Sequence, residues 1–389
     1  MSCPDQIQFV SSVSQVGSEE WDHLAGTLNT FVSHAFLQAL EKSGCVGERT
    51  GWIPYPLTIR DSEGRLVAAA PSYIKLHSKG EYIFDYHWAE AYHRLQPGLD
   101  YYPKLQVAVP YTPVPGPRLL VSSELPKNQQ QKYREKLLNA LREQAESVRF
   151  SSAHITFCEE VERTTAQESS GFLSRLGEQY HWFNEGYENF DDFLAALTSR
   201  KRKNIKKERR KAQSHGLEIH TFHGNELTDS LCLQFFRMYE KTCLRKWGQP
   251  YLNLAFFQEI AARLGDRLVL FLVRDTDGKW IAGAWNLRGD KTLFGRNWGC
   301  LRDYDCLHFE VCYYRALEYA IEHGLEKVEA GAQGLHKIQR GYRPRAVHSA
   351  HFFEPGPFKG AIEQYLLSER LETEFRLEAL TDLEPFRRD

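Results

Sequence analysis

The sequence predicts an α/β protein built from two halves of similar make-up. Segments with strand-like and helix-like patterns alternate across the first 185 residues, and the alternation recurs in the remainder of the chain. Hydrophobic residues make up 42% of the 389 residues, which is enough for a large core. We therefore expect an N-terminal domain of residues 1–185 and a C-terminal domain of residues 186–389.

The first half is expected to combine short strands with amphipathic helices. Ser33 is the expected N-cap of the helix at 31–44, and Gly44 its end. The turn at 61–65 separates two strand-like segments. The patterns predict strands at 7–13, 55–60, 66–78, 151–160 and 179–184, and helices from Ser18, over 31–44 and over 128–147.

The second half has the clearer patterns. Asp305 is suited to begin a helix that Gly324 ends, and apolar residues recur along it at steps of three and four. The patterns predict helices from Asn189 and over 199–213, 228–247, 253–265, 305–324 and 358–380, and strands at 217–224, 266–275, 279–290, 292–300, 325–331 and 349–355.

Composition excludes several classes of protein. The net charge of −2 argues against a general polyanion binder. No run approaches the ~18 apolar residues of a transmembrane helix, and the N-terminus lacks the pattern of a secretory signal. The eight cysteines are scattered, as in a reduced cytoplasmic protein. We expect a cytoplasmic protein, for which peripheral membrane contact stays open.

An aromatic stretch in the first half is a candidate ligand groove. Tyr, Trp and Phe residues crowd positions 82–111 beside a few charged side chains, and five prolines prevent regular helix over 103–117. Aromatic walls with few charges are typical of ligand sites, although a packed domain interface has a similar composition. The candidate substrate-binding residues are Asp85, Trp88, Tyr92, Tyr102 and Lys104.

A strongly basic helix is expected at 199–213. Nine of the twelve residues from Arg200 to Lys211 are Lys or Arg, and one is acidic. Such a helix cannot be buried, and tRNA phosphates, a nucleotide-linked sugar or an anionic lipid surface would relieve its repulsion. A merely solvated helix is the alternative. The candidate anion-binding or tRNA-binding residues are Arg200, Arg202, Lys203, Lys206, Lys207 and Arg210.

The segment from Cys306 to Arg343 carries the candidate chemistry. Glu310 lies on or beside the apolar face of the helix, so it either pairs with a nearby Arg or serves as a general base with a raised pKa. The loop that follows brings polar and cationic groups together within a few residues, which suits an anionic or carbonyl-bearing substrate but also an ordinary basic surface loop. These loop residues are Gln333, His336, Lys337, Arg340 and Tyr342.

Metal and cofactor motifs are not evident. His308 and Cys312 share a helix face, but the chain has no CxxC and no HExxH motif. It also lacks a Walker loop and a GxGxxG motif, and no Cys–His spacing supports a cysteine nucleophile. We expect no metal and no bound cofactor.

Six stretches in order carry a family resemblance: 84–94, 101–120, 246–252, 295–299, 307–314 and 329–344. Together they resemble the FemAB-like family of N-acyltransferases, whose members are labelled peptidoglycan biosynthesis or recognition proteins and belong to the wider GNAT-fold acyltransferases. The resemblance implies two tandem GNAT-like domains, each a mixed sheet flanked by helices. The family loop reads GAQGEHK, whereas this chain has Leu335 in place of the acid, which puts its activity in doubt.

The resemblance implies acyl or aminoacyl transfer from an activated donor to an amine. The donor, aminoacyl-tRNA or acyl-CoA, would be a co-substrate, and the acceptor an amine-bearing small molecule or peptidoglycan precursor. Glu310 or His336 would deprotonate the amine, Lys337, Arg340 or Arg296 would stabilise the oxyanion, and Tyr313 or Tyr342 would protonate the leaving group.

Arg296, Trp298 and His308 lie in the matching motifs and are candidate substrate-binding residues with Gln333, Arg340 and Tyr342. No GNAT-type Q/RxxGxG/A phosphate loop is evident, which disfavours simple acetyl-CoA chemistry. The competing class is a non-catalytic protein that recognises a cell-wall fragment or an anionic ligand.

Overall fold

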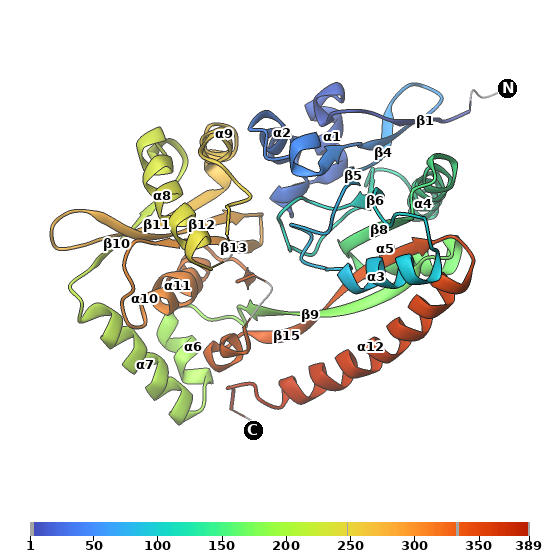
Figure 1. Ribbon diagram of the computed structural model, residues 1–389. Coiled ribbons are helices and arrows are strands. Elements are labelled where there is room, and N and C mark those ends of the chain that lie inside the picture. Colours follow the sequence, from blue (N-terminus) through green and yellow to red (C-terminus); the bar gives the residue numbers. More distant parts are fainter. Residues whose placement is uncertain (1–3, 247, 332–333, 388–389) are drawn as a thin grey trace. The chain divides into compact units, whose positions relative to one another are not determined.

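A computed structural model describes residues 4–246, 248–331 and 334–387 of the chain. It has two compact units (Figure 1). The first comprises residues 1–178 and 346–376, and the second residues 179–345 and 377–389. We expected the C-terminal half to stay in one domain from residue 186 onward. Residues 346–376 instead belong to the first unit, because residues 348–353 pair there with a strand of residues 152–158.

The first unit contains two sheets. One has the strand order β1-β3-β4-β7 and is antiparallel. The other has the order β15-β8-β6-β5-β2, and its β6 and β8 run parallel. The strands are β1 (Gln6–Phe9), β2 (Trp52–Pro54), β3 (Leu57–Arg60), β4 (Leu66–Ala70), β5 (Ser72–Lys75), β6 (Lys104–Val107), β7 (Leu120–Val121), β8 (Ser152–Cys158) and β15 (Arg343–Phe353).

Helices cover these sheets through apolar faces. α4 buries Leu137, Leu138 and Leu141 in one core with strand residues such as Val107 and Ile155. The helices are α1 (Ser18–Ala25), α2 (His34–Lys42), α3 (Tyr86–Leu95), α4 (Lys127–Val148), α5 (Glu160–Ser170) and α12 (Pro357–Thr381), with short 3-10 turns η1 (Val13–Gln15), η2 (Thr30–Val32) and η3 (Glu48–Thr50).

The second unit is organised around one sheet with the order β10-β11-β12-β13-β14-β9. All neighbouring strands in it are antiparallel except β13 and β14, which run parallel. The strands are β9 (Leu173–Phe183), β10 (Glu218–Phe222), β11 (Leu268–Arg274), β12 (Trp280–Arg288), β13 (Thr292–Cys300) and β14 (Lys327–Glu329).

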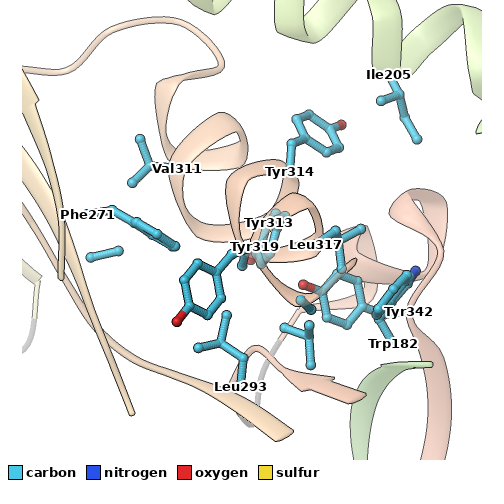
Figure 2. Packing of buried hydrophobic residues seen from close by; sticks show 14 of the residues in the cluster. Trp182, Ile205, Phe271, Leu293, Val311, Tyr313, Tyr314, Leu317, Tyr319 and Tyr342 are labelled. Atoms are coloured by element: carbon cyan, nitrogen blue, oxygen red, sulfur yellow. The ribbon is translucent and has the colours of Figure 1, made fainter. Parts of the chain in front are cut away.

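The connection between the two parallel strands is helical and forms the centre of the core. Tyr313, Tyr314, Leu317 and Tyr319 are all buried there (Figure 2). The helices are α6 (Phe190–Ala196), α7 (Ser199–Gln213), α8 (Asp229–Lys246), α9 (Leu254–Leu264), α10 (Leu307–Phe309) and α11 (Arg315–Glu322), with a π-helical turn η6 (Glu310–Tyr314) and 3-10 turns η4 (Gly224–Glu226), η5 (Gly265–Arg267) and η7 (Leu335–Arg340).

Side-chain caps explain why several helices begin where the sequence predicts. The Ser33 hydroxyl accepts the Phe36 N–H, and Asn189 accepts the Asp192 N–H at the start of α6. The basic helix α7 has the expected bounds, with only Ile205 and Ala212 buried on its inner face. No helix in the described part of the chain is long and apolar enough to cross a membrane.

Candidate active site

The parallel strands β13 and β14 pair over a short stretch. They pair at three positions, the last being Phe294 opposite Glu329. Beyond this point β13 continues to Cys300, whereas β14 ends. A cavity of about 100 Å³ opens there. It is lined by Ala284, Asn286, Gly295, Arg296, Asn297, Trp298, His308, Cys312, Tyr313 and Ala330. Ligands in open α/β sheets commonly bind at the carboxyl ends of parallel strands.

A β-bulge shapes the strand wall of this cavity. Trp285 pairs with Asn297 and Asn286 pairs with Gly295, so Arg296 is an extra residue in β13. A bulge bends a strand and redirects its side chains, and bulges are frequent beside active sites. The predicted residues Arg296 and Trp298 therefore both line the cavity.

The helical wall comes from α10 and the π-helical turn η6. His308, Cys312 and Tyr313 face the cavity, and the rings of His308 and Trp298 lie 5.3 Å apart. Burial, followed by the nearby His336, lowers the pKa of His308 to about 4, so this imidazole is neutral at pH 7. Single π-helical turns occur often at functional sites.

Tyr313 connects the cavity to the loop that the sequence singled out. Its hydroxyl lies 2.8 Å from Nε2 of His336 in η7. Burial raises the pKa of Tyr313, whereas burial and the cations of Arg340 and Lys337 lower the pKa of His336. A protonated phenol thus faces an imidazole that is neutral at pH 7. The pair can pass a proton between the loop and the cavity wall.

Lys337 is an unusual buried cation. Lys337 is only 2% exposed, and its Nζ donates a hydrogen bond of 2.7 Å to the Gly331 carbonyl. Burial lowers the pKa of Lys337 to about 7, and Cys312 opposes that effect. The amine is therefore close to its titration midpoint at neutral pH, which suits a general base or an adjustable positive charge.

Glu310 pairs with an arginine, as one of the two interpretations of the sequence predicted. Its carboxylate accepts hydrogen bonds of 2.8 and 3.1 Å from Arg209 of α7, which also binds Glu318 at 2.6 Å. Burial raises the pKa of Glu310, and Arg209 opposes that effect. A carboxylate held by a guanidinium is a poor general base, so the ion-pair interpretation fits this arrangement better.

The neighbouring residue on α7, Glu208, holds the other side of the loop. It accepts hydrogen bonds from Arg340 at 2.8 and 3.2 Å and from the Tyr314 hydroxyl. Arg340 in turn donates to the His336 carbonyl at 2.7 Å. Figure 2 shows Tyr314 pointing toward the helix that carries Ile205. Glu208 and Arg209 thus attach α7 to η7 and to the π-helical turn.

Sequence reasoning missed both of these residues, although signals were present. Glu208 is the single acidic residue of the basic run. Arg209 lies four residues after buried Ile205 and three before buried Ala212, which places it on the inner face.

Among the described residues, the hydroxyl of the predicted residue Tyr342 is buried without a hydrogen-bond partner, and burial raises the pKa of this phenol.

The outer face of α7 borders a groove of about 930 Å³. Of the predicted anion-binding residues, Lys203, Lys206, Lys207 and Arg210 line it, together with Phe190 of α6. Arg200 is exposed near the start of the helix, and Arg202 is half-buried there. The carboxylates of Asp191, which pairs with Lys206 at 3.6 Å, and of Glu318 also line the groove. Its excess of cations suits a phosphate-bearing ligand.

The candidate substrate-binding residues of the aromatic stretch lie in the first unit, and most of them are buried in its core. Asp85 and Lys104 are buried and bonded to each other, and Lys104 also binds Glu81 at 2.8 Å. Burial lowers the pKa of Lys104, but the two carboxylates outweigh it and the pKa is raised. Trp88 and Tyr92 are also buried. The chemistry of Asp85, Lys104 and Trp88 is thus directed into the core.

Tyr102 is half-buried and shares a groove with the buried Tyr92. Both line a groove of about 620 Å³ in the first unit, with Phe150, Phe353 and Phe358. The Tyr102 hydroxyl donates to Asp85 at 2.9 Å, so the buried carboxylate fixes the ring at the groove wall. This groove is the part of the predicted aromatic surface that can accept a ligand.

The first unit also has a parallel strand pair, but its end is filled. β6 and β8 pair in parallel up to Val107 and Ile155. The buried Arg118 guanidinium donates to the Thr156 carbonyl just beyond this point and to carbonyls of the preceding loop. The position that is a cavity in the second unit is occupied here by a side chain. This contrast favours the second unit as the reactive one.

Gln333, the expected absence of a metal site and Leu335 complete the predictions for the site. Gln333 lies outside the described residues. Within the described part of the chain, no cluster of three or more His, Cys, Asp or Glu side chains is arranged to hold a metal ion. Leu335, which stands where the family loop has an acid, is largely exposed at the start of η7.

Comparisons with known proteins agree with this architecture. The sequence profile of the FemAB-like family, described as peptidoglycan biosynthesis/recognition, matches residues 12–388. The chain therefore belongs to the FemAB-like family. No curated protein matches the chain.

Solved structures share the fold at low sequence identity. FemX is 13% identical, with a TM-score of 0.55 over 90% of this chain and 98% of that chain. A conserved protein of unknown function from Bacteroides thetaiotaomicron VPI-5482 is 11% identical, with a TM-score of 0.52 over 89% and 99% of the two chains. L-PGS from Bacillus licheniformis is 10% identical, with a TM-score of 0.48 over 90% and 96%. The likeness to FemX confirms the expected fold class of α/β units with mixed sheets flanked by helices.

Proposed function

We propose that this protein transfers an acyl or aminoacyl group from an activated donor to an amine during peptidoglycan biosynthesis. The family description supports the process. The single observation that carries the reaction is the cavity beyond the last paired residues of β13 and β14, because the Tyr313–His336 pair reaches its wall. The donor would be a co-substrate, either aminoacyl-tRNA or acyl-CoA, with no bound cofactor. Because both donors are cytoplasmic, so is the proposed reaction.

The proposed chemistry is a substitution at the donor carbonyl. The acceptor nitrogen bonds to the carbonyl carbon, the carbon–oxygen or carbon–sulfur bond to the carrier breaks, and the amine proton ends on the leaving group. Lys337 in its neutral form, or His336 through Tyr313, accepts the amine proton. Tyr313 protonates the leaving oxygen or sulfur and regains a proton from His336 or, through solvent, from the Lys337 ammonium. Arg296 supplies positive charge at the cavity for the developing oxyanion.

The outer face of α7 is the proposed contact for the donor phosphates. The groove of about 930 Å³ beside Lys203, Lys206, Lys207 and Arg210 supplies positive charge for phosphates. The inner face of the same helix holds the catalytic loop through Glu208. Donor binding on one face would therefore stabilise the loop that the other face holds.

Transfer can be tested directly with mass spectrometry. Purified protein would be incubated with amine-bearing peptidoglycan precursors and either charged tRNA or acyl-CoA, and the acylated amine would be quantified. We expect product with one donor class and a loss of at least a hundredfold for Tyr313→Phe and His336→Asn. Absence of product with both donors, despite donor binding, would reject the proposal.

A recognition function without catalysis is the second candidate, favoured by one observation. The Glu310 carboxylate, a predicted base, is held by Arg209. If the protein only binds its ligand, Glu310→Gln should retain affinity, and wild type should give no turnover. An enzyme would instead show turnover in the wild type, and that turnover is what separates the two functions.

A further inference from the structure

Asn286 places a buried amide in the wall of the cavity, and no step of the proposed reaction uses it. The residue is 1% exposed, lies in β12 and lines the cavity. Its Nδ2 donates hydrogen bonds of 2.9 Å to the Val269 carbonyl and 3.1 Å to the Ala284 carbonyl. Because an amide nitrogen carries two hydrogens, both are used. The only hydrogen-bonding capacity that this side chain still offers is that of its oxygen, as an acceptor.

The same two hydrogen bonds fix the direction of the amide. Both neighbours are carbonyl oxygens, so the amide nitrogen and not Oδ1 must face them. Oδ1 lies 3.5 Å from the position that a Cβ on Gly295 would take, and Gly295 also lines the cavity. Within the described part of the chain, no group donates a hydrogen bond to this oxygen. A buried acceptor without a donor is costly, so the oriented oxygen points to a ligand that supplies one.

The surroundings of this oxygen favour a neutral amine. Arg296 and Trp298 contribute side chains that can donate but not accept, and no Asp or Glu is among the described residues lining the cavity. A carboxylate at position 286 would favour the protonated amine, which has no lone pair for attack. A neutral amide oxygen accepts an N–H without imposing that charge.

We propose that Oδ1 of Asn286 binds an N–H of the acceptor amine and thereby selects primary amines, an assignment that rests on the proposed acyl transfer. A primary amine has two hydrogens. As the nitrogen bonds to the donor carbonyl carbon, one proton passes to Lys337, or through Tyr313 to His336. The other hydrogen donates to Oδ1 and stays on the nitrogen of the amide product. The nitrogen gains positive charge during attack, so this hydrogen bond strengthens in the transition state.

The size of the cavity agrees with this assignment. Its volume of about 100 Å³ equals that of roughly three water molecules at ~30 Å³ each. It therefore accommodates the reacting end of an acceptor and not the whole molecule. A methyl group on the reacting nitrogen would replace the hydrogen that bonds Oδ1 and would leave the buried oxygen unpaired. Secondary amines should thus be poor acceptors.

Transfer to two matched acceptors tests the role of Asn286. They are the primary-amine peptidoglycan precursor that gives product in the transfer assay and the same precursor with one methyl group on the reacting nitrogen. Wild type should transfer at least a hundredfold faster to the primary amine, because a site built to bond an N–H rejects an analogue that lacks it. Asn286→Ala should lose at least tenfold with the primary amine and reduce the preference to about tenfold or less. Such non-additivity reports a direct interaction between the side chain and the missing hydrogen.

Two further variants separate this role from a structural one. Asn286→Ser can still donate to one of the two carbonyls, so it costs less stability, yet its shorter side chain should reduce the preference in the same way. Gln106→Ala is the matched control, because Gln106 is a buried amide of β6 in the first unit that donates to the Thr156 hydroxyl at 3.0 Å. It should lower the free energy of unfolding in urea and keep the hundredfold preference.

The outcomes distinguish the role of Asn286 from the reaction itself. A wild-type preference below tenfold, or a preference that stays unchanged in a folded Asn286 variant, would overturn the role of Asn286 while acyl transfer stands. Absence of transfer from wild type to any primary amine would reject the proposed function and this assignment with it.

Discussion

Replacing Lys337 with methionine should stabilise the second unit while it impairs transfer. Lys337 is buried and donates a hydrogen bond to the Gly331 carbonyl, and methionine fills a similar volume without a charge. Burial lowers the lysine pKa from 10.5 to about 7. At pH 7 the folded protein therefore disfavours the charged form of this amine. Such a cost to stability is expected for a group that is retained for its chemistry.

The magnitude follows from linkage between protonation and folding. A pKa that falls by about 3.5 corresponds to roughly 5 kcal/mol at 1.36 kcal/mol for each pKa unit. Loss of the hydrogen bond to Gly331, worth about 1.5–3 kcal/mol for a charged donor, offsets part of this. Lys337→Met should thus raise the free energy of unfolding by about 2 kcal/mol at pH 7.

The effect should depend on pH with a defined sign. Between pH 7 and pH 10.5 the unfolded chain binds the Lys337 proton and the folded chain does not, so wild-type stability falls as the pH drops through this window. The advantage of methionine should therefore shrink toward zero at pH 10. Urea unfolding at pH 7 and pH 10, followed by circular dichroism, measures both differences.

Lys203→Met on the exposed face of α7 is the control for this measurement. It should stay within about 0.5 kcal/mol of wild type at both pH values. If Lys337→Met destabilises the protein at pH 7, or if its effect is the same at pH 7 and pH 10, the reasoning about Lys337 is wrong.

Three further substitutions probe other contacts. Tyr313→Phe removes the hydroxyl that bonds His336, so kcat should drop at least a hundredfold while the free energy of unfolding changes by less than about 1 kcal/mol. A retained kcat would remove Tyr313 from the mechanism. Glu208→Gln leaves the buried Arg340 without its carboxylate, so kcat should fall about tenfold with little change in KM, and an effect on KM alone would contradict a positioning role. Arg118→Met leaves several buried carbonyls of the first unit without a donor and should destabilise the protein by about 3–5 kcal/mol in urea unfolding, whereas a neutral effect would mean that water replaces the guanidinium.

Local sequence signals predicted most helices and strands, because capping and hydrophobic periodicity involve residues only a few positions apart. The basic run between Thr198 and Gly216 has the predicted bounds of α7, and Ser33, Asn189 and Asn253 cap helices through contacts three residues away. The helix α3 was not anticipated in the aromatic stretch. Its Tyr and Trp residues have no strong helix preference, and burial of Trp88 and Tyr92 in the core decides the conformation.

Long-range pairing could not be read from local patterns. The strand at 349–355 was expected in the C-terminal domain, but residues 348–353 pair with β8, almost two hundred residues earlier in the chain. No periodicity encodes which strand is the neighbour. The same holds for Glu310, whose partner Arg209 lies 101 residues away.

The candidate site was predicted in part because its chemistry is concentrated in two motifs. Arg296, Trp298, His308 and Tyr313 meet at one cavity, as residues of neighbouring motifs can. Lys337 was recognisable as a loop cation, but its burial depends on the surrounding fold and has no local signal. The catalytic roles of these residues remain predictions.

The most direct test of the account is to fill the cavity between β13 and β14. Ala284 lines it from β12, and leucine at this position would occupy much of the ~100 Å³ without altering a proposed catalytic group. With charged tRNA or acyl-CoA as donor, Ala284→Leu should lose at least a hundredfold in transfer while the protein stays folded and α7 still binds the donor phosphates. Transfer at the wild-type rate by a folded Ala284→Leu protein would place the reaction elsewhere and contradict the central claim.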